Sequence, residues 1–147
     1  MKLFSKIYGD GQDHLIIIHG LFGMSDNWGS LAKLYADFFE VHLIDQRNHG
    51  RSPHADEFSY LHLSNDLHQY ITVNQLNDVI IIGHSLGGKT AMQFAVSFPE
   101  LVYKLIIVDI SPRFYPIHHD KIIEGLKILD FSILKSRSQV DGVLSKY

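Results

Sequence analysis

The 147-residue chain has a net charge of −3 at pH 7, and hydrophobic and charged residues make up 46% and 20% of it. This balance is typical of a globular domain, excludes a disordered or membrane-embedded chain and gives no reason to expect nucleic acid as a partner. The chain has no cysteine, which excludes a disulfide framework, a thiol nucleophile and a thiolate metal site.

The hydropathy pattern contains no apolar stretch near the roughly 20 residues that span a bilayer. The N-terminal residues 1–5 lack the apolar core of a secretion signal. We therefore expect a cytoplasmic protein without a membrane partner.

Apolar runs predict five strands, at residues 3–8, 15–18, 41–44, 79–82 and 104–108. Helical patterns separate most of them, at residues 26–39, 60–76 and 89–98, the last stopped by Pro99. Strands that alternate with helices imply an α/β fold, with a doubly wound, mostly parallel sheet and helices on both faces. Ligands of such sheets bind beyond the carboxyl ends of the strands.

The first helix is expected to use Ser25 or Asp26 as its N-cap. Its apolar residues recur every three or four positions and predict one buried face. They are Trp28, Leu31, Leu34, Tyr35 and Phe38.

Residues 19–23, His-Gly-Leu-Phe-Gly, follow the second predicted strand. A loop at this place can direct a backbone amide at a developing oxyanion, although a plain turn with a buried histidine gives the same pattern. We expect His19 to brace the loop by hydrogen bonds rather than to transfer protons.

Residues 45–52 follow the third strand and offer Asp45 and His49 close together. A catalytic or metal site is one interpretation, but a metal needs three or four convergent ligands. The favoured interpretation is a turn, in which Asp45 and Arg47 form charge-assisted hydrogen bonds and Gly50 lets the chain reverse. No metal site is predicted.

Residues 78–88 run from an unbroken Val/Ile strand into Gly-x-Ser-x-Gly and then a helix. This context favours a nucleophile elbow, with Ser85 exposed at a sharp turn, over an ordinary Gly/Ser loop. Gly83 and Gly87 would remove side-chain collisions around the strained serine. The amide of Leu86, together with that of Leu21, would complete an oxyanion hole with two donors.

Asp109 ends the strand after the elbow helix, where its carboxylate could orient a histidine; alternatively it could cap the turn at residues 111–112. The base itself is the missing part. Only His118 and His119 follow Asp109, and their position before an amphipathic helix is more typical of solvated or substrate-facing residues. His84, inside the elbow, is expected to point away from the serine and to pack beside it.

Together, residues 19–23, 45–52, 83–89 and 108–112 resemble the α/β-hydrolase superfamily, most closely the small bacterial esterases of the YbfF type. The resemblance covers essentially the whole chain. It implies Ser85 as nucleophile, Asp109 as triad acid, the amides of Leu21 and Leu86 as oxyanion donors, and activity on short-chain acyl esters or thioesters without a cofactor.

Family members are longer, continuing through a helical cap to strands that deliver the histidine. We therefore expect this chain to be an N-terminal half, with residues 1–112 belonging to the hydrolase core and 113–147 beginning the cap. The segment from residue 113 onward is expected to be helical. A sheet edge left uncovered would favour association with a second copy.

The resulting hypothesis is a serine hydrolase that works through an acyl-enzyme on Ser85, with Phe22, Phe114 and Tyr115 as apolar walls for a small-molecule substrate. Thioester cleavage, perhydrolysis and carbon–carbon bond hydrolysis stay open. The alternative is that this chain, lacking a base, is catalytically incompetent and acts as a ligand-binding or assembly module.

Overall fold

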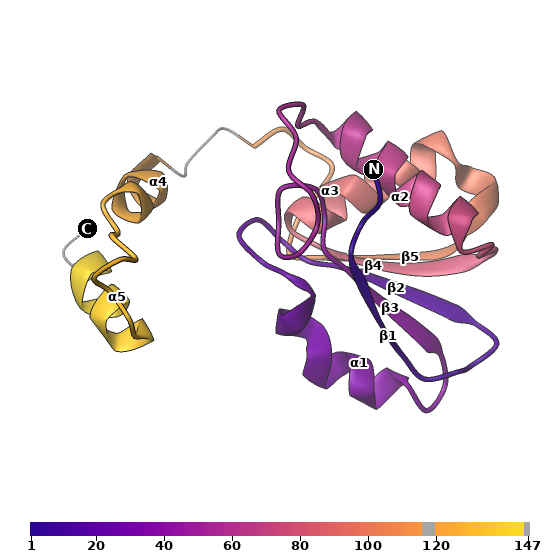
Figure 1. Cartoon of the computed structure of the whole chain (residues 1–147). Coiled ribbons are helices and arrows are strands. Elements are labelled where there is room, and N and C mark those ends of the chain that lie inside the picture. The colour runs from indigo at the N-terminus through magenta and orange to yellow at the C-terminus, as the bar shows by residue number, and fades with distance from the viewer. Residues whose placement is uncertain (116–119, 146–147) are drawn as a thin grey trace. The chain divides into compact units, whose positions relative to one another are not determined.

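A five-stranded sheet with the order β1-β3-β2-β4-β5 forms the centre of the first part of the chain. The strands are β1 Ser5–Tyr8, β2 His14–Ile18, β3 Glu40–Ile44, β4 Val79–His84 and β5 Val102–Val108. All neighbouring pairs are parallel except β1 with β3. In this computed structural model, which describes residues 1–115 and 120–145, the predicted mostly parallel sheet is confirmed (Figure 1).

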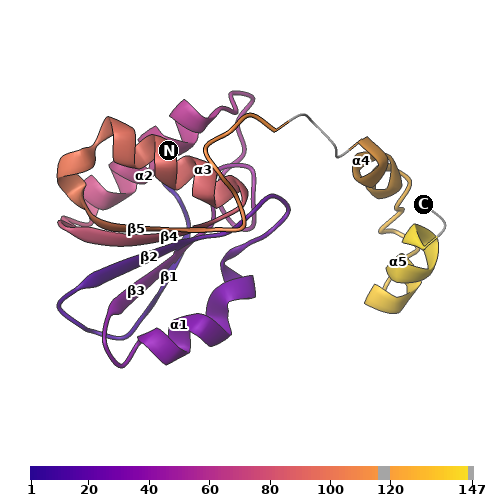
Figure 2. The same ribbon diagram turned by 180° about the vertical axis from the view of Figure 1, so that it is seen from behind.

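Helices cover both faces of the sheet, as expected for a doubly wound α/β fold. Figures 1 and 2 show α1 on one face and α2 and α3 on the other. The elements are η1 Ser25–Trp28, α1 Gly29–Tyr35, α2 Tyr60–Val73, α3 Leu86–Ser97 and η2 Pro99–Leu101. None of the helices in the described residues is long and apolar enough to cross a membrane.

The central strands are apolar without alternation because both of their faces are buried. Ile16 and Ile18 of β2 pack with Phe94 of α3 in one core cluster, whereas Leu15 and Ile17 join Ala32 of α1 in the other. Successive side chains of a strand point to opposite faces, so an unbroken apolar run supplies both cores.

The predicted first helix is shorter than expected and packs differently. Residues 25–28 form a 3-10 turn, and the α-helix covers only Gly29–Tyr35. Met24 and Trp28 hold the two N-cap positions, so the prediction of Ser25 or Asp26 is wrong. Leu34 and Phe38 are 68% and 71% exposed, while the small Ala32 is fully buried.

The helix predicted at residues 60–76 is present as α2, and its predicted apolar face is buried. The side chain of Ser59 accepts a hydrogen bond from the backbone N–H of His62 and caps the helix. Leu63, Leu67 and Ile71 are buried in the core. The helix ends at Val73 rather than at residue 76.

Contacts divide the chain into two units, Met1–Pro112 and Arg113–Tyr147. The second unit contains α4 Asp120–Lys127 and α5 Arg137–Leu144, so the helices predicted for this segment are present in its described residues. The side chain of Ser136 caps α5 and, with Gln139, forms a capping box.

A buried ion pair ties the loop after β3 to α2. The Arg47 guanidinium donates two hydrogen bonds to the carboxylate of Asp66, at 2.6 and 3.0 Å, and both side chains are less than a tenth exposed. This bidentate contact supports the interpretation of residues 45–52 as a structured turn.

We expect Asp66→Ala to lower the free energy of unfolding by about 3–5 kcal/mol, because it leaves the Arg47 charge buried without its partner. The matched control is Asp26→Ala, which breaks the exposed pairs with Arg51 and Lys6 and should cost much less, because water screens both pairs. Urea denaturation of the two variants measures the difference. Equal losses would contradict the assignment.

Candidate active site

Ser85 lies at the corner where β4 ends and α3 begins. Its backbone has φ 50° and ψ −113°, a conformation that a non-glycine residue rarely adopts. The Ser85 N–H donates to Val108 O at 3.0 Å, and Ser85 O accepts from Lys89 N at 3.1 Å. The surrounding strand and helix therefore hold the strained residue at both of its peptide groups.

The two flanking glycines allow close approach of the backbone. A Cβ added to Gly83 would lie 2.5 Å from Gly87 O, and one added to Gly87 would lie 2.3 Å from Ile18 O. Both distances are shorter than any real contact, so side chains at these positions would push α3 off the sheet. Only glycine fits at these two positions, as expected from the sequence.

The loop after β2 packs directly against this corner. A Cβ on Gly20 would lie 2.9 Å from His84 Nδ1 and 3.2 Å from Ser85 Cβ. Gly23 N donates to Gly20 O at 3.0 Å and closes a tight turn in which Phe22 has φ 60°. The structure thus brings the loop that carries Leu21 beside the elbow that carries Ser85.

His19 is buried and uses both ring nitrogens in hydrogen bonds. Nδ1 bonds to Gly20 O at 2.8 Å, and because a carbonyl only accepts, Nδ1 carries the proton. Nε2 accepts from Gln46 N at 3.1 Å. Gln46 Nε2 also donates to His19 O, and Thr90 Oγ1 donates to Gln46 Oε1. This network agrees with the expected bracing role of His19.

The loop after β3 is also organised by hydrogen bonds. The Asp45 carboxylate accepts from Ser25 N at 2.5 Å and from Arg51 N at 2.9 Å. Gly50 has φ 54° and packs against the same carboxylate, so the chain reverses there as predicted. Among the described residues, no group of three potential metal ligands forms at Asp45 or His49.

Asp109 follows β5 at the same edge of the sheet, with φ 56° and an 85% exposed side chain. Its Oδ2 lies 3.8 Å from Nε2 of His84, the residue before Ser85. The His84 ring also lies beside Trp28, with 6.0 Å between ring centroids. The structure therefore places Asp109 beside the elbow, and its nearest described imidazole is that of His84.

The histidine that would activate Ser85 is not among the described contacts. Within residues 1–115 and 120–145, no hydrogen bond joins the Ser85 hydroxyl to a histidine. His118 and His119 lie outside the described residues.

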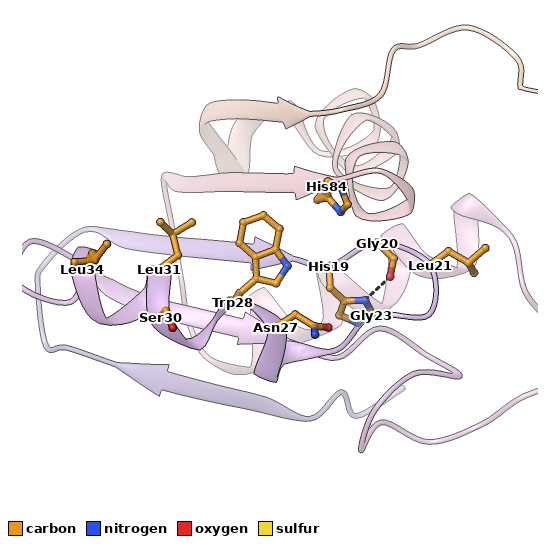
Figure 3. A pocket seen from close by; sticks show the side chains of 10 residues that line it. All are labelled: His19, Gly20, Leu21, Gly23, Asn27, Trp28, Ser30, Leu31, Leu34 and His84. Atoms are coloured by element: carbon orange, nitrogen blue, oxygen red, sulfur yellow. Dashed lines mark hydrogen bonds between the residues drawn. The ribbon is translucent and has the colours of Figure 1, made fainter. Parts of the chain in front are cut away.

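A pocket of about 580 Å³ opens beside the elbow (Figure 3). The loop after β2 and His84 line one part of it, and the η1–α1 segment lines the rest with two polar residues, Asn27 and Ser30, and three apolar side chains. Those apolar side chains are Trp28, Leu31 and Leu34. Sequence reasoning missed them as pocket residues because their helical spacing was interpreted as a core face.

The three residues expected as substrate walls do not line this pocket. Phe22 is on the loop after β2 but is 57% exposed. Phe114 and Tyr115 belong to the second unit, in which the guanidinium of Arg113 lies over the Tyr115 ring at 4.7 Å. Their expected role stays a prediction.

Comparison with known proteins gives consistent matches. The sequence profile of the alpha/beta hydrolase fold matches residues 13–131. Esterase YbfF of Escherichia coli is 31% identical over 134 residues, which cover 90% of this chain and 53% of that protein. The sn-1-specific diacylglycerol lipase ABHD11 of Mus musculus is 43% identical over 100 residues, 67% of this chain and 33% of the lipase.

Among solved structures, a marine microorganism esterase is 49% identical and superimposes with a TM-score of 0.94. The match covers 99% of this chain and 58% of that esterase. The chain thus spans about half the length of these two esterases.

Burial lowers the pKa of His19 below its ordinary value of 6.5. In the unfolded chain His19 has its ordinary pKa, and in the folded chain its pKa is lower. At a pH between these two values the unfolded chain binds the proton and the folded chain does not, so the free energy of unfolding falls as the pH drops below about 6.5. We expect urea unfolding at pH 7.0 and 5.5 to show this loss, and a His19→Asn variant to show less of it. An NMR titration in which folded His19 is protonated at pH 7 would contradict the prediction.

Proposed function

Because this chain belongs to the α/β hydrolase fold family, we propose that the protein hydrolyses carboxylic esters through an acyl-enzyme on Ser85. The observation that carries the proposal is the strained backbone of Ser85 at the β4–α3 corner, packed against Gly20. Such a corner exposes the hydroxyl that the chemistry needs.

The reaction has two halves. Ser85 Oγ attacks the ester carbonyl and loses its proton to a base, and the resulting tetrahedral oxyanion is stabilised by the amides of Leu21 and Leu86. The alcohol leaves with a proton, and water then cleaves the acyl-enzyme. Leu86 is the first residue of α3, so the positive end of the helix dipole adds to the stabilisation.

Asp109 is the proposed acid that orients the base and stabilises its protonated form. His84 is a poor candidate for that base. It is joined directly to Ser85 within the β4–α3 turn, its ring lies beside Trp28 and Asp109, and no described hydrogen bond joins it to the Ser85 hydroxyl. The proposed triad therefore needs another histidine as its base, one that none of the described hydrogen bonds connects to Ser85.

The alternative is that the 147-residue chain by itself is catalytically incompetent and binds ligands or assembles with other chains. It is favoured by one observation: among the described residues, no histidine is hydrogen bonded to the Ser85 hydroxyl. Without a base the hydroxyl stays protonated, and only the residual catalysis of the oxyanion hole would operate.

The proposed substrates are small acyl esters, with short-chain acyl thioesters as the second candidate class. The apolar surface of Trp28 and Leu31 in the pocket supports an apolar acyl or alcohol group. Esterase and lipase names among the relatives agree with ester chemistry. Phe22, Phe114 and Tyr115 are proposed as further walls, with residues 113–147 as the beginning of a helical cap.

In a form of the protein that hydrolyses p-nitrophenyl acetate, Ser85→Ala should lower kcat by on the order of a millionfold, because a triad member is lost. Ser97→Ala, at the exposed end of α3, is the matched control and should leave kcat unchanged. Retained hydrolysis by the Ser85 variant would refute the nucleophile assignment. For the 147-residue chain alone, rapid turnover together with fluorophosphonate labelling of Ser85 would refute the incompetence alternative.

The outer edge of β5 is proposed as a contact with a second copy of the chain. β5 ends the strand order and carries exposed apolar side chains, Tyr103 at 63% and Ile106 at 45%. An unpaired apolar edge is prone to association.

We expect Ile106→Lys to reduce self-association of the 147-residue chain in sedimentation velocity, because a charge on an edge strand blocks pairing. Val96→Lys, on an 80% exposed position of α3, is the control and should not change it. A parent chain that is monomeric at tens of micromolar would contradict the prediction.

A further inference from the structure

Three potential metal ligands meet at the amino ends of β2 and β3. His14 begins β2, Glu40 begins β3, and the parallel register pairs these two residues. His42 is two residues beyond Glu40 and therefore on the same face of the sheet. Ser85 follows the carboxyl end of the parallel strand β4. The group of three therefore lies near the amino ends of the strands, and the proposed active site lies at their carboxyl ends.

The ligand atoms of the three side chains lie close together. Glu40 Oε1 lies 2.9 Å from His42 Nε2 and 3.3 Å from His14 Nδ1. All three atoms lie within 4.8 Å of one another. In a tetrahedral site with metal–ligand bonds of 2.0–2.1 Å, neighbouring ligand atoms are about 3.3 Å apart. The two distances from Glu40 Oε1 are thus close to the spacing of ligand atoms in a formed site.

The surroundings hold the ligands in place. The His42 side chain is 1% exposed, and its other nitrogen, Nδ1, is hydrogen bonded to the Tyr70 hydroxyl at 2.8 Å. A second partner of this kind orients the ring of a metal-bound histidine. The two imidazole rings meet edge to face, at 69°, rather than stacking against each other.

A buried polar atom at the same point lacks a hydrogen bond. His14 Nδ1 is inaccessible to solvent and has no hydrogen-bond partner, although it faces Glu40. An unpaired buried nitrogen is costly, and a cation between it and the carboxylate would satisfy both. The side chains of His14 and Glu40 are 25% and 31% exposed, which gives an ion a route from solvent.

We propose that His14, Glu40 and His42 bind one Zn²⁺ ion, with water in the fourth position. Two imidazole nitrogens and one carboxylate oxygen are a ligand set that suits this ion. The bound ion would join the first residues of β2 and β3 and stabilise the folded chain. It would take no part in the chemistry at Ser85.

The test uses the chelator-treated 147-residue chain and Zn²⁺ alone, at pH 7.5. We expect isothermal titration calorimetry to give one site, and a hundredfold excess of Zn²⁺ over its Kd to raise the melting temperature by about 5–10 °C. Glu40→Gln and His14→Ala should each weaken binding at least tenfold, since even an outer partner of a metal ligand contributes 10–100-fold.

The exposed His54 provides the control, and His54→Ala should leave the Zn²⁺ affinity unchanged. His42→Ala is avoided because the ring is part of the core. A chain that binds no Zn²⁺, or whose affinity is the same in the Glu40 and His14 variants as in the parent, would overturn the proposal. So would a loss of affinity in the His54 variant as large as theirs. Each outcome is independent of esterase activity.

Discussion

The close approach of α3 to the sheet is the constraint on which the site depends. Gly87 lies so near β2 that a methyl group there would be 2.3 Å from Ile18 O, and one on Gly83 would be 2.5 Å from Gly87 O of α3. This contact lets the chain turn from β4 into α3 in a single residue, which leaves Ser85 with a positive φ. A conformation of this kind costs about 1–3 kcal/mol and persists only where the surroundings impose it.

The parallel sheet then brings separate loops to that corner. The loops after β2, β3 and β4 all start at carboxyl ends of parallel strands and therefore share one edge. Gln46 donates hydrogen bonds to His19, and Thr90 of α3 donates one to Gln46, so the loops after β2 and β3 and the helix after β4 are tied together in the buried interior. A network whose members are all satisfied makes the position of the Gly20–Leu21 turn rigid relative to Ser85.

Local features were predictable from sequence, whereas features that depend on tertiary distances were not. A Leu/Ile run identifies β2 and a Val/Ile run identifies β4, because both faces of these strands are buried. Gly-x-Ser-x-Gly identifies the elbow because its steric rule is local. The face of α1 was mistaken, since Leu31 and Leu34 border a pocket while Ala32 is packed. The His14–Glu40–His42 group depends on the register of β2 against β3, which the sequence alone does not show. The only signal in the sequence is the two-residue spacing of Glu40 and His42, which places both side chains on one face of a strand.

A crystal structure of the chain that resolves the Ser85 backbone tests the central claim most directly. We predict a φ near +50° and a ψ near −113°, with Oγ exposed beside the Leu21 and Leu86 amides. A serine with negative φ, or with Oγ packed into the interior away from these two amides, would contradict it.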